Sequence, residues 1–179
     1  PGHVDFTAEV ERCLRVLDGA VVVFSAREGV EAQSETVWRQ ADRYKVPRLA
    51  FINKMDREGA DFERTFDEIA QRLSAHPVAL QIPVGVGPAH TSDAFRGVID
   101  LIEMKMLVFD PQTEGRIVQE LEIPEDKLAA AELWRDTMLE KLYVHSDELM
   151  ELALQEQPIP SELIRKVVRQ ATLQLQIQP

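Results

Sequence analysis

The sequence of 179 residues has a single cysteine, Cys13, and no long continuous apolar run. One thiol excludes an internal disulfide framework and a cysteine-based zinc site. The longest apolar stretch, residues 19–26, is interrupted by Ser25, and a transmembrane helix needs about 20 apolar residues. The chain does not open with a basic segment followed by an apolar one, so nothing in it indicates export. We therefore expect a protein of the cytoplasm that does not enter a membrane.

Basic side chains are scarce, with 20 Lys and Arg against 31 Asp and Glu, which gives a net charge of −11. Residues 1–90 carry 11 basic and 14 acidic side chains, and residues 91–179 carry 9 and 17. The net charges of the two halves are therefore −3 and −8. A segment this acidic cannot neutralise a phosphate backbone. We expect no strong direct binding of nucleic acid.

None of the eight glycines is followed by lysine. The chain therefore contains no phosphate loop of the form Gly-x-x-x-x-Gly-Lys-Ser/Thr, whose backbone and lysine cradle nucleotide phosphates. The histidines His76, His90 and His145 do not have the spacing of metal ligands, so we assign no metal site.

The first part of the sequence alternates between helical periodicity and short apolar runs. The first helix ends at Asp18-Gly19, and Cys13 lies on its apolar stripe, which predicts a buried thiol. The runs 20–24 and 49–52 are typical of parallel strands that are buried on both faces. Two more helices are expected, one over residues 32–44 and one after the N-cap Asp61. This order is half of a doubly wound parallel sheet.

From about residue 77 the pattern changes. Strands are expected in 78–84, 97–109 and 116–123, and helices in 125–142, 147–155 and 162–173. Strands followed by helices indicate a separate α+β subdomain. We therefore predict an α/β fold with an incomplete parallel sheet, in which residues 1–76 form the first domain, 77–160 an inserted α+β subdomain and 161–179 a helix that returns to the first domain.

The strongest chemical signal is Asn53-Lys54-Met55-Asp56, directly after the second strand. Ligands of open α/β sheets bind beyond the carboxyl ends of the strands. The Asp56 carboxylate can accept hydrogen bonds from both the ring N–H and the exocyclic amine of guanine, and adenine offers no such pair. Asn53 can bond the base edge, and the stem of Lys54 can cover its face. A site of this kind can discriminate between bases by roughly four orders of magnitude.

A second signal is Pro1-Gly2-His3-Val4-Asp5-Phe6, immediately before the first helix. Gly2 has a backbone N–H that can approach a phosphate without a Cβ in the way. His3 is placed where an imidazole could orient a water molecule. Either residue alone is a weak signal, but the guanine-type motif downstream makes the pair informative.

With these motifs, the sequence resembles the GTP-binding domain of the elongation factor G family of translational GTPases. The likeness extends through Gln33–Ala41, Phe51–Arg57, Gly97–Leu101 and Ile123–Asp126, and so covers essentially the whole chain. It implies a P-loop GTPase fold. It also implies that Gly2 senses the γ-phosphate, that His3 is the catalytic residue that positions the attacking water, and that Asn53, Lys54 and Asp56 bind the guanine.

The resemblance also implies GTP or GDP and Mg²⁺ as ligands of the complete protein, and the ribosome as its partner. The inserted subdomain would meet the ribosomal stalk protein, and the complete protein would move tRNA and mRNA through the ribosome. The alternatives are a GTPase release factor, a recycling-specialised or organellar paralogue, and a non-catalytic stalk-binding module.

Several parts of the family's nucleotide site have no match in this sequence. These are the phosphate loop, the switch threonine, the aspartate of the γ-phosphate motif and the Ser-Ala base loop. The chain looks cut at both ends of the family's domain. We therefore expect this segment alone neither to hydrolyse GTP nor to bind it tightly, and its sheet to have exposed edges.

Overall fold

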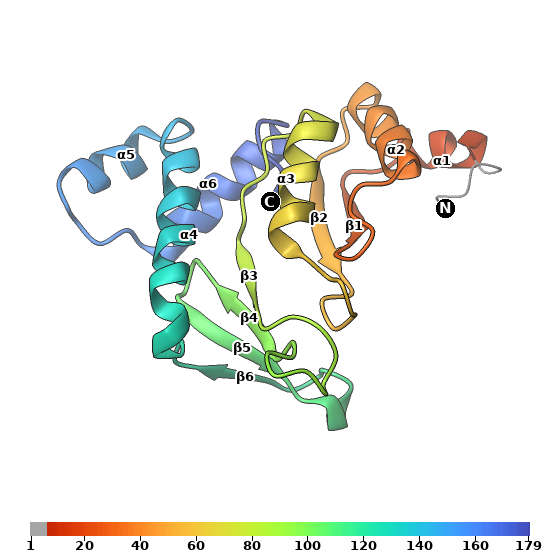
Figure 1. Cartoon of the computed structure of the whole chain (residues 1–179). Coiled ribbons are helices and arrows are strands. Elements are labelled where there is room, and N and C mark those ends of the chain that lie inside the picture. Colours follow the sequence, from red (N-terminus) through yellow and green to blue (C-terminus); the bar gives the residue numbers. More distant parts are fainter. Residues whose placement is uncertain (1–6) are drawn as a thin grey trace. The chain divides into compact units, whose positions relative to one another are not determined.

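A computed structural model describes residues 7–179, and the chain divides into two compact units (Figure 1). The first unit comprises the described residues up to Pro77 together with Ala171–Pro179, and the second unit comprises Val78–Gln170. The predicted boundary after residue 76 lies next to the observed one. Residues 161–170, however, belong to the second unit, whereas the sequence placed them with the first. None of the helices within residues 7–179 has both the length and the apolar character to cross a membrane.

The first unit contains a two-stranded parallel sheet of β1 (Ala20–Ser25) and β2 (Arg48–Asn53). Their register pairs Ala20 with Arg48 and Ser25 with Asn53, so the two strands end together. The helices of this unit are α1 (Thr7–Leu14), α2 (Ala32–Arg43) and α3 (Phe62–Leu73). Asp61 is the N-cap of α3, as predicted, because its side chain accepts from the backbone N–H of Arg64 at 2.9 Å.

One face of the sheet packs on α2 and α3. Phe24 of β1, Trp38 of α2 and Ile69 of α3 form a buried cluster, each with at most 2% of its surface exposed. Val22, Ala50 and Ile52 pack against the cluster from the strands. Successive strand side chains alternate between faces, which fixes this set as the inner one.

The opposite face of the same sheet is exposed. Val21 and Val23 of β1 are 61% and 56% exposed, and Leu49 and Phe51 of β2 are 45% and 54% exposed. The prediction that both strands are buried on both faces is therefore wrong for this chain. The apolar runs do form strands, but nothing within the described residues covers their outer side chains. We call these four residues the outer face.

The prediction of a buried thiol is also wrong, because Cys13 is exposed. Helix α1 ends at Leu14, which is earlier than the sequence pattern indicated. Its buried positions are Val10 and Leu14, which cluster with Ala41 and Val46. These two positions are one helical turn apart, and Cys13 lies beside this stripe instead of on it.

The end of the chain returns to the first unit beside β2. Gln178 forms a parallel bridge with Pro77, and its backbone N–H donates to the carbonyl of His76 at 3.1 Å. The Gln178 side chain accepts from the backbone N–H of His76 at 2.8 Å. The carbonyl of Pro179 accepts from the N–H of Ala50 of β2 at 2.8 Å.

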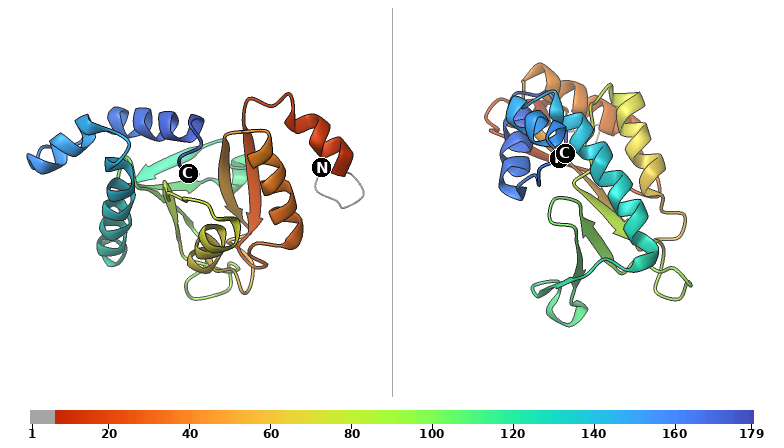
Figure 2. Two further views of the ribbon diagram at one scale, coloured as in Figure 1. Left: turned by 90° about the horizontal axis from the view of Figure 1, so that it is seen from above. Right: turned by 90° about the vertical axis from the view of Figure 1, so that its left-hand side faces the viewer.

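The second unit contains an antiparallel sheet of β3 (Gln81–Val84), β4 (Gly97–Asp100), β5 (Lys105–Phe109) and β6 (Val118–Leu121), in that order. It also contains α4 (Glu125–Tyr143), α5 (Asp147–Leu154) and α6 (Ser161–Leu173) up to Gln170, and Figure 2 shows these helices from two further sides. A short 3-10 turn covers Pro111–Thr113. These elements confirm the expected α/β class, with parallel strands followed by an α+β unit.

Two helices hold the turn between β4 and β5. Arg135 of α4 donates to the carbonyls of Leu101 and Ile102, the latter at 2.7 Å. Glu103 accepts from Arg165 of α6 at 2.8 Å and from the Ser161 hydroxyl at 3.1 Å. These bonds explain why the first turns of α6 belong to the second unit.

The bonds from Arg165 and then Ser161 hold the pKa of Glu103 below its usual range, and the charges of Arg165 and Arg135 add to this effect. A carboxylate with a lowered folded-state pKa stabilises the fold above its unfolded pKa, and this contribution is lost as pH falls through the folded pKa. We expect Glu103→Gln to lower Tm at pH 7 by about 1–3 °C. The difference should shrink below about pH 4.

Thermal unfolding followed by circular dichroism across pH 3–7 measures this difference. Glu132→Gln, an exposed change on α4, is the matched control and should leave Tm unchanged. A Tm difference for Glu103→Gln that stays constant down to pH 3 would contradict the expectation.

Candidate functional site

The candidate site lies at the common carboxyl ends of β1 and β2. Ser25 and Asn53 are the last residues of the two strands and lie opposite each other in the register. The N–H of Ala26 donates to the carbonyl of Asn53 at 2.8 Å, so pairing continues one residue further. In an open α/β sheet this edge is where ligands bind. The Asn-Lys-x-Asp motif therefore begins at the place that its predicted chemistry requires.

The motif forms a tight turn after β2. The Asn53 side-chain carbonyl accepts from the backbone N–H of Lys54 at 2.8 Å, and Lys54 has a φ of 64°, in the left-handed region. The carbonyl of Lys54 accepts from the N–H of Arg57 at 3.1 Å. Met55 is 7% exposed and fixes the turn to the protein, while its neighbours Lys54 and Asp56 are exposed. The turn thus buries one side chain and presents the polar ones to solvent.

Asp56 presents an accessible carboxylate. Its side chain is 64% exposed and lies 3.9 Å from Arg57 Nε, a weak interaction at this exposure. The interpretation of the motif as a base site would have failed if Asp56 were buried among apolar side chains. Its position three residues beyond the end of β2 is compatible with a carboxylate that accepts from a base.

Gly2 and His3, predicted to sense the γ-phosphate and to orient water, lie outside the described residues. Asn53, Lys54 and Asp56 remain as the described members of the predicted set, and all three belong to one turn. Their roles stay predictions.

The sequence interpretation missed a set of residues on α3 that bonds the loop after β1. Arg64, Glu68 and Arg72 lie one helical turn apart and bond the loop that follows β1. The signal was available, because polar residues at i, i+4 and i+8 share one face of a helix. Sequence alone does not distinguish them, because charged residues with this spacing commonly form a solvated face.

A magnesium ion requires oxygen ligands converging on one point. Within residues 7–179, no three His, Cys, Asp or Glu side chains gather in a way that could hold a metal ion. We derive no chemical step through Mg²⁺.

Comparison with known proteins agrees with the fold. The family model "Elongation factor Tu GTP binding domain" matches residues 1–168. An elongation factor G from Salinibacter ruber is 52% identical over 180 residues, which is 100% of this chain and 25% of that protein. Elongation factor G 1 from Treponema denticola is 52% identical over 173 residues, which is 97% of this chain and 25% of that protein.

This chain thus spans about a quarter of the length of the curated relatives that it matches. In structure, it is similar to the crystal structure of ttk003000868 from Thermus thermophilus, with a TM-score of 0.83 and 23% identity. That match covers 100% of this chain and 26% of the other, and supports the fold alone. Since the family model covers nearly all of the sequence, the chain belongs to the elongation factor Tu GTP-binding-domain family.

Proposed function

We propose that this chain forms the guanine-recognition part of a translational GTPase that drives movement of tRNA and mRNA on the ribosome. The observation that carries the proposal is the exposed Asp56 carboxylate in the turn that leaves β2, preceded by Asn53 and Lys54. Asp56 accepts the ring N–H and the amine of guanine, Asn53 bonds the base edge, and the stem of Lys54 covers the base. Relatives named elongation factor G, 52% identical, support the cellular role.

Within that protein, Gly2 senses the γ-phosphate and His3 orients the attacking water. Phosphoryl transfer in GTPases depends on positioning and on charge stabilisation by a phosphate loop and Mg²⁺. The sequence contains no phosphate loop, the element whose Ser/Thr hydroxyl binds Mg²⁺. We therefore propose that the chain by itself neither hydrolyses GTP nor binds it tightly, and that it acts in the cytoplasm as part of a larger catalytic domain.

The second unit is proposed to contact the ribosomal stalk protein. Helices α4 and α5 carry exposed apolar side chains among acidic ones, including Leu133 at 67% and Leu154 at 78% exposure. Apolar residues within a polar rim are typical of protein interfaces. Binding of the stalk protein without nucleotide would favour the alternative of a non-catalytic interaction module for the isolated chain.

The test of base recognition uses nucleosides, because they lack the phosphates that this chain is not built to hold. Guanosine, inosine and adenosine are titrated into ¹⁵N-labelled chain, and backbone amide shifts are followed by NMR. Guanosine should perturb residues 53–57 in the millimolar range, inosine less strongly because it lacks the amine, and adenosine least. Equal perturbation by guanosine and adenosine would overturn the proposed base recognition.

Tight binding of the complete nucleotide is a separate expectation. Calorimetric titration of the chain with GTP and Mg²⁺ should give no saturable binding at micromolar concentration. Affinity in the micromolar range or better would contradict the proposal that the isolated chain lacks the main phosphate contacts.

A further inference from the structure

Hydrogen bonds among residues 25–29 shape the first part of the loop between β1 and α2. The Ser25 hydroxyl oxygen accepts from the backbone N–H groups of Arg27 at 3.3 Å and Glu28 at 3.4 Å. The N–H of Gly29 donates to the carbonyl of Ser25 at 2.8 Å, and Gly29 has a φ of 71°, a conformation that favours glycine. These bonds make a tight turn in which the side chain of Glu28 returns toward Ser25.

Helix α3 fixes the same loop from behind. Arg64 Nη2 donates to the carbonyls of Ala26 at 3.1 Å and Arg27 at 2.6 Å. Glu68 accepts from the backbone N–H of Val30 at 2.8 Å, and Arg72 donates to the carbonyl of Val30. Both ends of the loop are therefore bonded to one rigid element, and the position of Glu28 between them is restricted.

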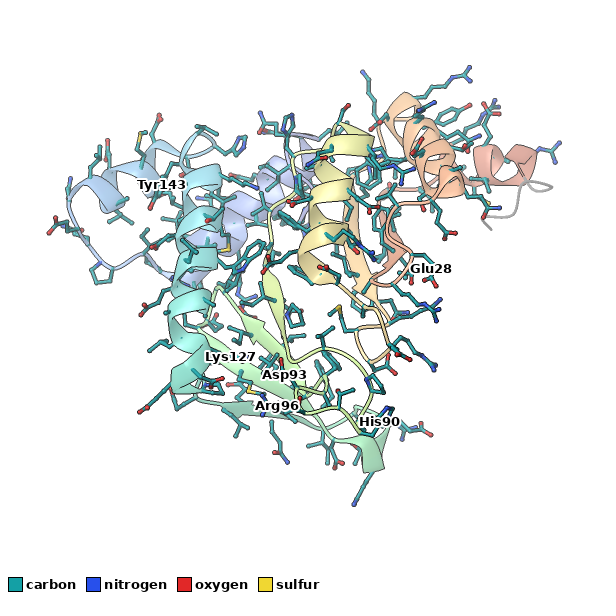
Figure 3. The ribbon with its side chains drawn as sticks, in the orientation of Figure 1. Glu28, His90, Asp93, Arg96, Lys127 and Tyr143 are labelled. Atoms are coloured by element: carbon teal, nitrogen blue, oxygen red, sulfur yellow. The ribbon has the colours of Figure 1, made fainter. Side chains whose placement is uncertain are left out.

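Glu28 connects this loop to the guanine motif. Its Oε2 accepts from the Ser25 hydroxyl and lies 3.7 Å from Lys54 Nζ. Its Oε1 lies 3.8 Å from Arg27 Nε. The hydrogen bond from Ser25, and then the charges of Lys54 and Arg27, hold the pKa of Glu28 below its usual range. Figure 3 marks Glu28 on the loop after β1, at the edge of the sheet where the motif begins.

We infer that Glu28 is a positioning residue of the base site: its carboxylate, held by Ser25 and the α3-bound loop, restrains Lys54 so that the stem of Lys54 is ready to cover the base. This inference rests on the proposed guanine recognition. Lys54 has a long flexible side chain, which loses rotamer freedom when it covers a ligand. A contact that restrains the side chain before binding reduces that loss. Glu28 itself touches no ligand.

The test compares guanosine affinity, from the same NMR titration, for the unchanged chain and for Glu28→Gln. The pair is partly exposed, with 52% of the Lys54 and 40% of the Glu28 side chain accessible, so the effect is modest. We expect guanosine binding to weaken about two- to fivefold, while the ratio of guanosine to adenosine affinity stays unchanged. Glu31→Gln, an exposed change three residues along the same loop, is the control and should leave guanosine affinity unaltered.

A double-mutant cycle distinguishes positioning of Lys54 from a general effect on the fold. In a Lys54→Met background, Glu28→Gln should no longer change guanosine affinity, because the restrained ammonium is gone. The ¹³Cε signal of Lys54 in the ligand-free chain gives a second readout, and should lose its distinct shift in Glu28→Gln. Equal losses of affinity with and without Lys54, or an unchanged affinity in Glu28→Gln, would overturn the inference.

The two proposals fail in different ways. If the unchanged chain does not prefer guanosine to adenosine, the base-recognition proposal fails, and the role of Glu28 fails with it. If the preference is present but Glu28→Gln behaves like Glu31→Gln, only the positioning role fails.

Discussion

Asp56→Asn is expected to change the base preference of the chain from guanosine to xanthosine. Guanine offers two donors to the carboxylate, the ring N–H and the exocyclic amine. Xanthine keeps the ring N–H and has a carbonyl in place of the amine. An asparagine side chain accepts from the first group and donates to the second. The substitution replaces one carboxylate oxygen, an acceptor, by an amide NH₂ group, a donor, and the preferred base changes with it.

The size of the effect follows from the cost of an unmatched hydrogen bond. Loss of a hydrogen bond to a charged group costs about 1.5–3 kcal/mol, so guanosine binding should weaken about 10- to 100-fold. Xanthosine, which is repelled by the unchanged carboxylate, should bind Asp56→Asn more tightly than guanosine does. Nucleoside titrations followed by NMR measure both affinities.

Asp67→Asn provides the matched control for this change, since Asp67 is an exposed aspartate on α3. It should bind guanosine as the unchanged chain does. If Asp56→Asn keeps the original preference for guanosine, then Asp56 does not read the base.

Trp38→Ala is expected to cause the largest loss of stability in the first unit. Trp38 is 2% exposed and its ring centroid lies 6.1 Å from that of Phe24. The Arg48 guanidinium lies 4.4 Å from the centroid of the Trp38 ring. Truncation of a buried aromatic residue leaves a cavity and costs about 3–5 kcal/mol. That is a large share of the stability of an ordinary domain.

Arg48 adds to this expected loss. Its side chain is 1% exposed, and it donates to the carbonyl of Trp38 at 3.0 Å and pairs with Asp42 at 2.5 Å. Its Nε is buried without a hydrogen-bond partner, so the face of the Trp38 ring is part of what compensates the buried charge. Removal of the indole therefore leaves a cavity and also removes the ring face that stabilises the buried Arg48 guanidinium.

Urea unfolding followed by far-UV circular dichroism measures the change in the free energy of unfolding. Trp38→Phe keeps an aromatic face and should cost less than Trp38→Ala. Leu133→Ala, at a position that is 67% exposed, should change stability by no more than about 0.5 kcal/mol. A loss for Trp38→Ala as small as that for Leu133→Ala would contradict the packing of Trp38 against Phe24 and Arg48.

The sequence predicted the positions of helices and strands better than it predicted which of their side chains are buried. Asp61 was identified as an N-cap because it precedes a helical apolar stripe, and the structure confirms it. The run at residues 20–24 correctly predicted a strand, but an apolar residue does not indicate whether another element covers it. The predicted burial of Cys13 is wrong because α1 ends at Leu14, and the length of a helix decides which of its side chains are buried. Helix ends are only weakly determined by sequence.

Within the candidate site, the sequence predicted the residues of a known motif and missed Glu28, which lies 3.7 Å from Lys54. Asn53, Lys54 and Asp56 are consecutive or nearly so, and their chemistry is recognisable from residue type alone. Glu28 comes within reach of Lys54 only because β1 and β2 are parallel and end in register. The two residues are 26 positions apart in the sequence. Hydrophobic periodicity predicts that each strand exists, but it does not predict which strands pair or in what register.

The outer face of β1 and β2 has a thermodynamic consequence. Any folded partner or chain segment that covers Val21, Val23, Leu49 and Phe51 binds the native state and not the unfolded one. Mass action then raises the unfolding free energy of the first unit with the logarithm of the partner's concentration relative to its dissociation constant. The unfolding temperature of this chain should therefore rise with the concentration of any partner that covers the outer face.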